Sequence, residues 1–353
     1  MNCSYHISYP VCRRDHLTPL LFKPSFRLCQ SYRLHSVPCS LPLVPCAFLY
    51  FLCIPHMETI HYSACPLCGS GQISSTLKAK DNTVSGEVVE IWECGDCTAR
   101  FTQDIPLASS IGKYYQATSY ISHTDTREGI VNKIYHQVRK ITLNTKKSLV
   151  QKVTSLKKGK LLDIGAGTGL FAKTMQDAGW QVKGLEPDEG ARYIAAKANM
   201  QLEQSSALFE IPVQSFDAIT MWHVLEHVHE LHRYLDRCNQ LLIGNGKLII
   251  AVPNYTSADA QHYGPYWAAY DVPRHLYHLN AVSMQLLLTR HGFKIERISP
   301  QWFDSFYVSL LSEQYKTGKT KLFKGAWNGL RSNLHALGNR KRCSSLVYVA
   351  GKG

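Results

Sequence analysis

The sequence predicts an α/β protein with a doubly wound, mostly parallel sheet, preceded by a cysteine-rich module and interrupted near its C-terminus by a helical insertion. Three observations lead to this prediction. From residue 160 onward, apolar strands alternate with helical segments, as parallel strands require because each crossover needs a helix. Two Cys-x-x-Cys pairs precede that region, and a basic, aromatic-bearing stretch, 301–343, separates the last two predicted strands.

Residues 1–56 do not resemble a folded domain. They show no periodicity, contain no Glu, and end in an apolar run, 45–55, that is shorter than the roughly 20 residues needed to cross a bilayer. A signal peptide would place its basic residues close to that run and a small-residue cleavage site after it, and neither is found. We expect a translated upstream stretch with Met57 as the working start. A disordered extension and a cleaved targeting sequence are the alternatives.

Residues 57–105 are predicted to form a zinc ribbon. Cys65 and Cys68 form one pair and Cys94 and Cys97 the other, each on a tight turn that bears glycine. Four thiolates are the ligands of a closed, tetrahedral structural Zn²⁺ site. The alternative is four reduced thiols without an ion. Cysteines used in this way favour a reducing, cytoplasmic location over a disulfide framework.

Residues 106–158 are predicted to hold a linker and a long amphipathic helix that packs across the start of the α/β domain. The helix is expected to begin near Thr126. Its apolar side chains share one face at helical spacing: Ile130, Ile134, Val138 and Ile141.

Residues 159–353 are the predicted α/β domain, with the insertion at 301–343. Strands are expected at 160–164, 182–186, 216–221, 247–252, 293–298 and 345–350. Helices are expected at 170–178, 189–198, 228–242 and 282–291.

The formal net charge of +13 is concentrated at the two ends of the chain. Residues 1–56 hold five basic side chains against one acidic side chain, and residues 301–343 hold eight against two. The insertion is interpreted as a helical cap over the sheet, with contact to a membrane surface or an apolar partner as the alternative.

The turn after the first strand of this domain predicts a bound ligand that lacks a pyrophosphate. Asp163 is followed by glycines at 165, 167 and 169, where backbone amides can approach a ligand beyond the strand ends. The dinucleotide pattern G-x-G-x-x-G is not met, because Leu170 stands at its third glycine. Glu186 ends the next strand, where a carboxylate can accept both hydroxyls of a ribose.

These residues resemble the class I S-adenosylmethionine-dependent methyltransferases over residues 160–254. The family's motifs appear in order as LLDIGAGTGLFA, VKGLEPD, SFDAITMWHVLEHV and GKLIIAVPN. The resemblance implies a Rossmann-like seven-stranded sheet and S-adenosylmethionine as methyl donor. It implies donor contacts from Asp163, Gly165, Ala166, Gly167, Glu186, Pro187 and Trp222. The acidic residue that many members place near the adenine is absent from 204–207, where backbone amides or Ser206 would serve.

The tyrosine-rich segment after the cysteine pairs is similar to that of the family's zinc-ribbon subgroup, the ubiquinone-biosynthesis-like methyltransferases. In that arrangement the segment would close over the donor, with Tyr115, Tyr120 and His123 as contacts. The alternative is an aromatic linker packed on the domain.

Candidate catalytic residues follow the fourth strand of the family's order. Transfer of a methyl group to oxygen needs alignment and a base for the hydroxyl proton. His223 and His227 could serve as that base, and His275 is a rival. Alternatively, Glu226 and His227 hold a divalent ion, as in some related quinone methyltransferases, or form a network that fixes the loop.

Residues 263–278 are predicted to bind the acceptor, because class I enzymes build that site after the fifth strand. Arg274 suits a carboxylate, phosphate or phenolate, Trp267 and Tyr270 suit stacking, and His278 lies in the same stretch. The alternative for each is a local hydrogen-bonding role.

The sequence therefore predicts a methyltransferase for a small or lipid-like acceptor, acting at oxygen. The alternatives are transfer to RNA or protein, sugar C-methylation, and a donor-binding scaffold without turnover. A polymer is disfavoured, because the ribbon carries more acidic than basic residues and the fourth strand is not followed by an NPPY-like tetrad. A cytoplasmic location with peripheral membrane contact through 301–343 is expected, and no oligomeric state is predicted.

Overall fold

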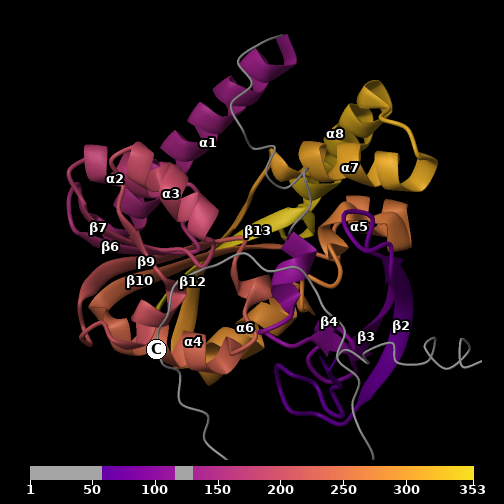
Figure 1. Ribbon diagram of the computed structural model, residues 1–353, viewed down its shortest axis with the longest axis horizontal. Coiled ribbons are helices and arrows are strands. Elements are labelled where there is room, and N and C mark those ends of the chain that lie inside the picture. The colour runs from indigo at the N-terminus through magenta and orange to yellow at the C-terminus, as the bar shows by residue number, and fades with distance from the viewer. Residues whose placement is uncertain (1–57, 116–129) are drawn as a thin grey trace, which may run out of the picture. The chain divides into compact units, whose positions relative to one another are not determined.

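The computed structural model describes residues 58–115 and 130–353, with only the backbone described for 130–136. Within these ranges, a small antiparallel sheet precedes a larger sheet that carries helices on both faces (Figure 1). The expectations for residues 1–56 and for a helix start at Thr126 lie outside the described residues.

The N-terminal module is a four-stranded antiparallel sheet in the order β11-β4-β3-β2. Its strand β11 comes from the α/β domain, so the sheet extends beyond the predicted 57–105 module. A separate two-stranded antiparallel sheet is formed by β1 and β5, which precede and follow β2, β3 and β4 in the sequence. The bounds are β1 Thr59–Ile60, β2 Ile73–Lys80, β3 Val88–Cys94, β4 Arg100–Thr102, β5 Ile105–Pro106 and β11 Tyr277–His278.

The large sheet has seven strands in the order β12-β13-β10-β9-β6-β7-β8. The pairings from β10 to β8 are parallel, whereas β13 runs antiparallel to β10 and β12. The predicted seven-stranded, mostly parallel sheet is thus confirmed. Its strands are β6 Lys160–Ile164, β7 Gln181–Leu185, β8 Leu202–Glu203, β9 Phe216–Trp222, β10 Leu242–Pro253, β12 Phe293–Pro300 and β13 Ser345–Lys352.

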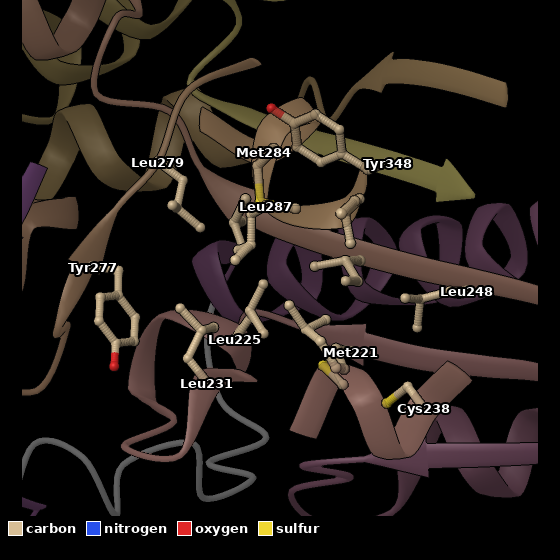
Figure 2. Close-up of a cluster of buried hydrophobic side chains, with 14 of the residues drawn as sticks. Met221, Leu225, Leu231, Cys238, Leu248, Tyr277, Leu279, Met284, Leu287 and Tyr348 are labelled. Carbon is tan, nitrogen blue, oxygen red and sulfur yellow. The ribbon is translucent and has the colours of Figure 1, made fainter. Parts of the chain in front are cut away.

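Alternate residues of each strand pack on opposite faces, as the pleat requires. Along β6, Leu161 packs in one cluster with Phe171, while Leu162 packs in another with Leu235. Figure 2 shows part of the second cluster, between the sheet and the helices α4 and α6. The helices of the first face are α1 Ile130–Thr154, α2 Leu170–Asp177 and α3 Glu189–Lys197, and those of the second are α4 Leu231–Leu241 and α6 Ala281–Arg290 (Figure 1).

The segment after β9 differs from the sequence prediction. A helix was expected over 228–242, but a 3₁₀ turn, Leu225–His227, comes first and α4 begins only at Leu231. The reason is local, because Val228 is extended with ψ of 114° and interrupts the helical path. Strand β10 begins earlier than predicted, and its register with β9 is irregular between Leu242 and Lys247.

The insertion is helical, as predicted, and its two helices form a hairpin: α7 Asp304–Thr317 and α8 Leu322–Gly338. The two helices pack on each other and on α5 Ala258–Tyr263 (Figure 1). Among the described residues, no helix combines the length and apolar character needed to cross a bilayer.

Candidate active site

The strand order reverses beside β6, where β7 and β8 follow on one side and β9 returns on the other. In open α/β sheets, ligands bind beyond the carboxyl ends of the strands at such a reversal. Asp163 lies near the end of β6, Glu186 directly follows β7, and Trp222 ends β9. The fold therefore brings together three of the residues predicted to contact the donor.

The glycine turn after β6 depends on glycine for two different reasons. Gly165 and Gly167 have φ of 68° and 55°, in the left-handed region that glycine adopts readily. A Cβ at Gly165 would lie 2.4 Å from Cγ2 of Val224, whereas a Cβ at Gly167 would meet nothing within 4 Å. Gly165 is therefore required by packing against the loop after β9, and Gly167 by its backbone conformation.

Glu186 is held against this turn by backbone donors. Its Oε2 accepts the N–H of Gly167 at 2.7 Å, and its Oε1 accepts the N–H of Asp188 at 3.0 Å. Burial raises its pKa. The carbonyl of Pro187 accepts from Arg192 at 2.7 Å, and the N–H of Ala166 donates to Leu185 at 2.9 Å. The carboxylate thus has a fixed position beside the turn.

Asp163 is buried below the turn. The hydroxyl of Thr220 on β9 donates to its Oδ1 at 2.6 Å. Burial raises the pKa of Asp163 to about 7, against the lowering effects of Thr220 and of Lys146. Its charge therefore changes near neutrality.

Lys146, on α1, joins the site and was not found from the sequence. Its Nζ lies 4.4 Å from the centre of the Trp222 ring, and burial lowers its pKa. The Trp222 ring also packs edge-on against Phe171 at 5.4 Å. The indole N–H of Trp222 is buried without a partner in the described structure. Only the packing of α1 on the sheet places Lys146 there, so no local motif marks it.

His223 is held between two carboxylates. Its Nε2 lies 2.9 Å from Oδ2 of Asp304, and its Nδ1 lies 3.4 Å from Oε1 of Glu226. Burial alone would lower the pKa of His223, but these carboxylates outweigh it and raise the pKa to about 10. An imidazolium cannot accept a proton, so at neutral pH this geometry disfavours His223 as the base. Asp304 belongs to the insertion and was also missed by the sequence analysis.

Glu226, His227 and His275 form a compact cluster in which Glu226 and His275 are buried and His227 is half-buried. One donor atom of each residue lies within 4.8 Å of the others, and the two imidazole rings are 4.5 Å apart. The N–H of Leu276 donates to the carbonyl of Glu226 at 2.7 Å and joins the two segments. The sequence analysis proposed Glu226 and His227 as an ion site, and the structure adds His275.

Backbone carbonyls orient both histidines of this cluster. Nδ1 of His227 lies 3.0 Å from the carbonyl of Arg274, and Nδ1 of His275 lies 2.9 Å from that of Ala269. Because a carbonyl only accepts, each Nδ1 carries the hydrogen and each Nε2 keeps its lone pair. Burial, and then the neighbouring His275, lower the pKa of His227 to about 4. His227 is therefore neutral at pH 7, as a metal ligand must be.

The cluster fits a divalent cation. Both carboxylate oxygens of Glu226 are buried and accept no hydrogen bond in the described structure, and Oε1 has an ion-pair contact of 3.4 Å with Nδ1 of His223. A buried carboxylate without hydrogen bonds is costly, so a bound cation would supply the close partner that these oxygens lack. Two imidazoles and one carboxylate suit Zn²⁺, Fe²⁺ or Mn²⁺, and carbonyls that fix the histidine tautomers are the usual outer partners of such sites.

The four predicted zinc ligands converge. Sγ of Cys65 lies 3.6 Å from Sγ of Cys97, and Sγ of Cys68 lies 3.6 Å from that of Cys94. A tetrahedral ion with bonds of about 2.3 Å places its sulfurs roughly 3.8 Å apart. The set therefore has the separation of a closed zinc site.

The residues predicted to bind the acceptor are buried, and their polar groups form hydrogen bonds within the protein. The indole of Trp267 donates to Asp259 at 2.8 Å, the hydroxyl of Tyr270 accepts from Arg100 at 3.1 Å, and His278 lies 3.2 Å from the hydroxyl of Thr102. Arg274 is fully buried. It donates to Asp271, Asp81, Thr83 and the carbonyl of Tyr114. These contacts match the alternative of local hydrogen-bonding roles.

The predicted lid residues are only partly described. The hydroxyl of Tyr115 lies 3.0 Å from Nδ1 of His227, so Tyr115 reaches the cluster. Tyr120 and His123 lie outside the described residues.

The central part of the chain is similar to known proteins. Residues 136–298 match the family model described as a methyltransferase domain. An uncharacterized methyltransferase of Alkaliphilus oremlandii is 32% identical over 35% of this chain and 60% of the relative. A ubiquinone biosynthesis O-methyltransferase of Rhodopseudomonas palustris is 30% identical over 27% of this chain and 40% of the relative. The chain thus spans about half the length of these relatives.

The likeness to solved structures is weaker. A SAM dependent methyltransferase from Archaeoglobus fulgidus is 17% identical with a TM-score of 0.41, covering 60% of this chain and 94% of that one. The PH0226 protein from Pyrococcus horikoshii is 16% identical with a TM-score of 0.44, covering 68% and 99%.

Proposed function

We propose that this chain, whose residues 136–298 match the methyltransferase-domain family model, is a class I S-adenosylmethionine-dependent methyltransferase that transfers the donor's methyl group to an oxygen of a small or lipid-like acceptor. The observation that carries the proposal is the buried carboxylate of Glu226 beside two oriented imidazoles, in the turn that follows β9. Oxygen acceptors are the ones that require a group to manage the hydroxyl proton.

The donor would lie across the carboxyl ends of β6 and β7. In this arrangement Glu186 accepts the ribose hydroxyls, because its carboxylate is already fixed beside Gly167. Asp163 provides negative charge below the donor's ammonium group, and Trp222 forms an apolar wall. His223, paired with Asp304, supplies fixed positive charge at the end of β9.

Glu226, His227 and His275 would hold a divalent ion. When bound, such an ion acts as a Lewis acid that lowers the pKa of a coordinated hydroxyl. The protein's part is to hold Nε2 of both histidines in place through the carbonyls of Arg274 and Ala269. A structural Zn²⁺ in the four-cysteine site would stabilise the sheet that packs behind this segment.

The test of function is transfer of labelled methyl groups from S-adenosylmethionine to fractionated cell extracts by the full chain. We expect label in organic-soluble material, released as methyl iodide by hot hydriodic acid, which cleaves O-methyl groups and not C-methyl groups. Label found only in RNA or protein, or resistant to cleavage, would contradict the proposal. Glu186→Gln is the control that should abolish donor binding.

The ion is tested separately by metal content. After dialysis against Zn²⁺, the chain should retain two equivalents, Glu226→Gln one, and Cys94→Ser one. Glu226→Gln should keep its donor affinity, because Glu226 does not contact the donor in this proposal. Two equivalents retained by Glu226→Gln would rule out the second metal site.

The location in the cell stays a prediction. The six described cysteines are all free thiols, which supports the expected reducing, cytoplasmic compartment.

A further inference from the structure

Helix α8 packs on its neighbour through small residues. Its buried positions are Gly325, Gly329, Ser332 and Ala336. A Cβ at Gly325 would lie 2.8 Å from Cα of Leu310, and one at Gly329 would lie 2.8 Å from Cα of Phe306. The two helix backbones of the hairpin therefore approach closely, and larger side chains have no room on this face.

The large apolar side chains of α8 point the other way. Phe323 is 95% exposed and Trp327 is 64% exposed, and both belong to a row spaced at one helical face. We call this row the α8 stripe: Phe323, Trp327, Leu330, Leu334 and Leu337, all exposed. A helix of a globular protein normally turns such residues inward. A contiguous exposed row of this kind marks an interaction surface.

The stretch of sequence that carries the stripe is basic. Residues 314–353 contain nine Lys and Arg residues and no Asp or Glu. Lys319 and Lys321 are exposed in the turn that leads into α8, next to Phe323. Lys324 reaches back to Glu313 at 2.9 Å. An apolar row with aromatic residues and flanking cations matches helices that lie in the headgroup region of anionic lipid.

We propose that the α8 stripe docks on the surface of an anionic lipid bilayer, with Phe323 and Trp327 in the interfacial region and the flanking lysines against the headgroups. The hairpin is a peripheral anchor. The proposal does not depend on the reaction that the chain catalyses. The same hairpin presents Asp304 to His223, so the proposed anchor is directly connected to the candidate active site.

The experiment is flotation of the purified full chain with vesicles. One set is phosphatidylcholine alone, and the other contains roughly one third phosphatidylglycerol. We expect binding to the anionic vesicles, weaker binding at high salt, and little binding to phosphatidylcholine. Phe323→Ser/Trp327→Ser should lower the partition coefficient at least about tenfold, because two aromatic side chains no longer insert.

Two variants separate the contributions. Lys319→Glu/Lys321→Glu keeps the stripe and should weaken binding to anionic vesicles only. Val282→Ser/Leu286→Ser removes two exposed apolar residues from α6 and should bind like the unaltered chain.

Equal binding by the stripe variant and the unaltered chain would overturn the proposal. The absence of binding to either kind of vesicle by the unaltered chain would also overturn it. A stripe that instead joins two copies would appear in analytical ultracentrifugation as a dimer that Phe323→Ser/Trp327→Ser converts to monomer without vesicle binding, and that outcome also overturns it. Circular dichroism and thermal unfolding confirm that each variant is folded.

Discussion

The guanidinium of Arg274 and the carboxylate of Asp81 meet at 3.3 Å in a place where both side chains are almost fully buried. Asp81 follows β2 in the N-terminal module, whereas Arg274 precedes β11 in the α/β domain. A second carboxylate, that of Asp271, lies 2.6 Å from the guanidinium of Arg274. The ion pair therefore joins the two parts of the chain, and the backbone of Arg274 also orients His227.

Arg274→Met should destabilise the protein by about 3–5 kcal/mol, because it leaves the buried carboxylate of Asp81 and the half-buried carboxylate of Asp271 without their cation. Urea unfolding followed by circular dichroism measures this. The matched control is Arg233→Met, which breaks an exposed pair with Glu230 and should cost at most about 1 kcal/mol. If Arg274→Met keeps its stability and loses only acceptor affinity, Arg274 binds the acceptor, as the sequence analysis expected.

Gly165→Ala should abolish donor binding. The new methyl group would lie 2.4 Å from Val224 and so displace the loop after β9. Titration calorimetry with S-adenosylmethionine provides the measurement. Gly318→Ala is the control, since it has φ of 70° but open space around its Cβ, and it should lose only about 1 kcal/mol of stability. Donor affinity lost to the same extent in both variants would indicate general destabilisation instead of a local clash.

The donor affinity should rise between pH 6 and pH 8. Burial raises the pKa of Asp163 to about 7, so the carboxylate proposed to face the donor's ammonium group becomes charged in this range. The same raised pKa affects stability without donor. Between about pH 4 and pH 7, Asp163 is protonated in the folded state but ionised in the unfolded state. The free energy of unfolding should therefore fall as the pH rises through this range. Asp163→Asn should remove both pH dependences relative to the unaltered chain. Their persistence in Asp163→Asn would assign them to another group.

Removal of zinc should loosen β2, β3 and β4 and the segment that they support. Hydrogen exchange after treatment with a strong chelator should show faster exchange in these strands and in 275–278, because Thr102 bonds both His275 and Leu276. Strands β6 and β7 should be unchanged. If the exchange rates of these strands are the same before and after chelation, the fold around the four thiols does not depend on a bound ion.

The positions of the glycine turn and of Glu186 in the fold could be predicted because their determinants are local. The glycine turn and Glu186 each lie at a strand end that hydrophobic patterning already locates. Asp304 and Lys146 could not be predicted, since only tertiary packing brings α7 and α1 to the end of β9. The buried partners of Arg274 and Tyr270 could not be predicted either, because a polar residue in a loop has the same sequence pattern whether it meets a ligand or a buried partner.

The pairing of β11 with β4 has a consequence for biosynthesis. The hydroxyl of Thr102 finds its acceptor, the carbonyl of His275, 173 residues further along the chain. At about 5–20 residues per second, the ribosome needs roughly 9–35 s to supply that partner. During this interval the outer edge of β4 stays open to other strands, a known route to aggregation. Early zinc binding or a chaperone would therefore protect the nascent N-terminal module until β11 is made.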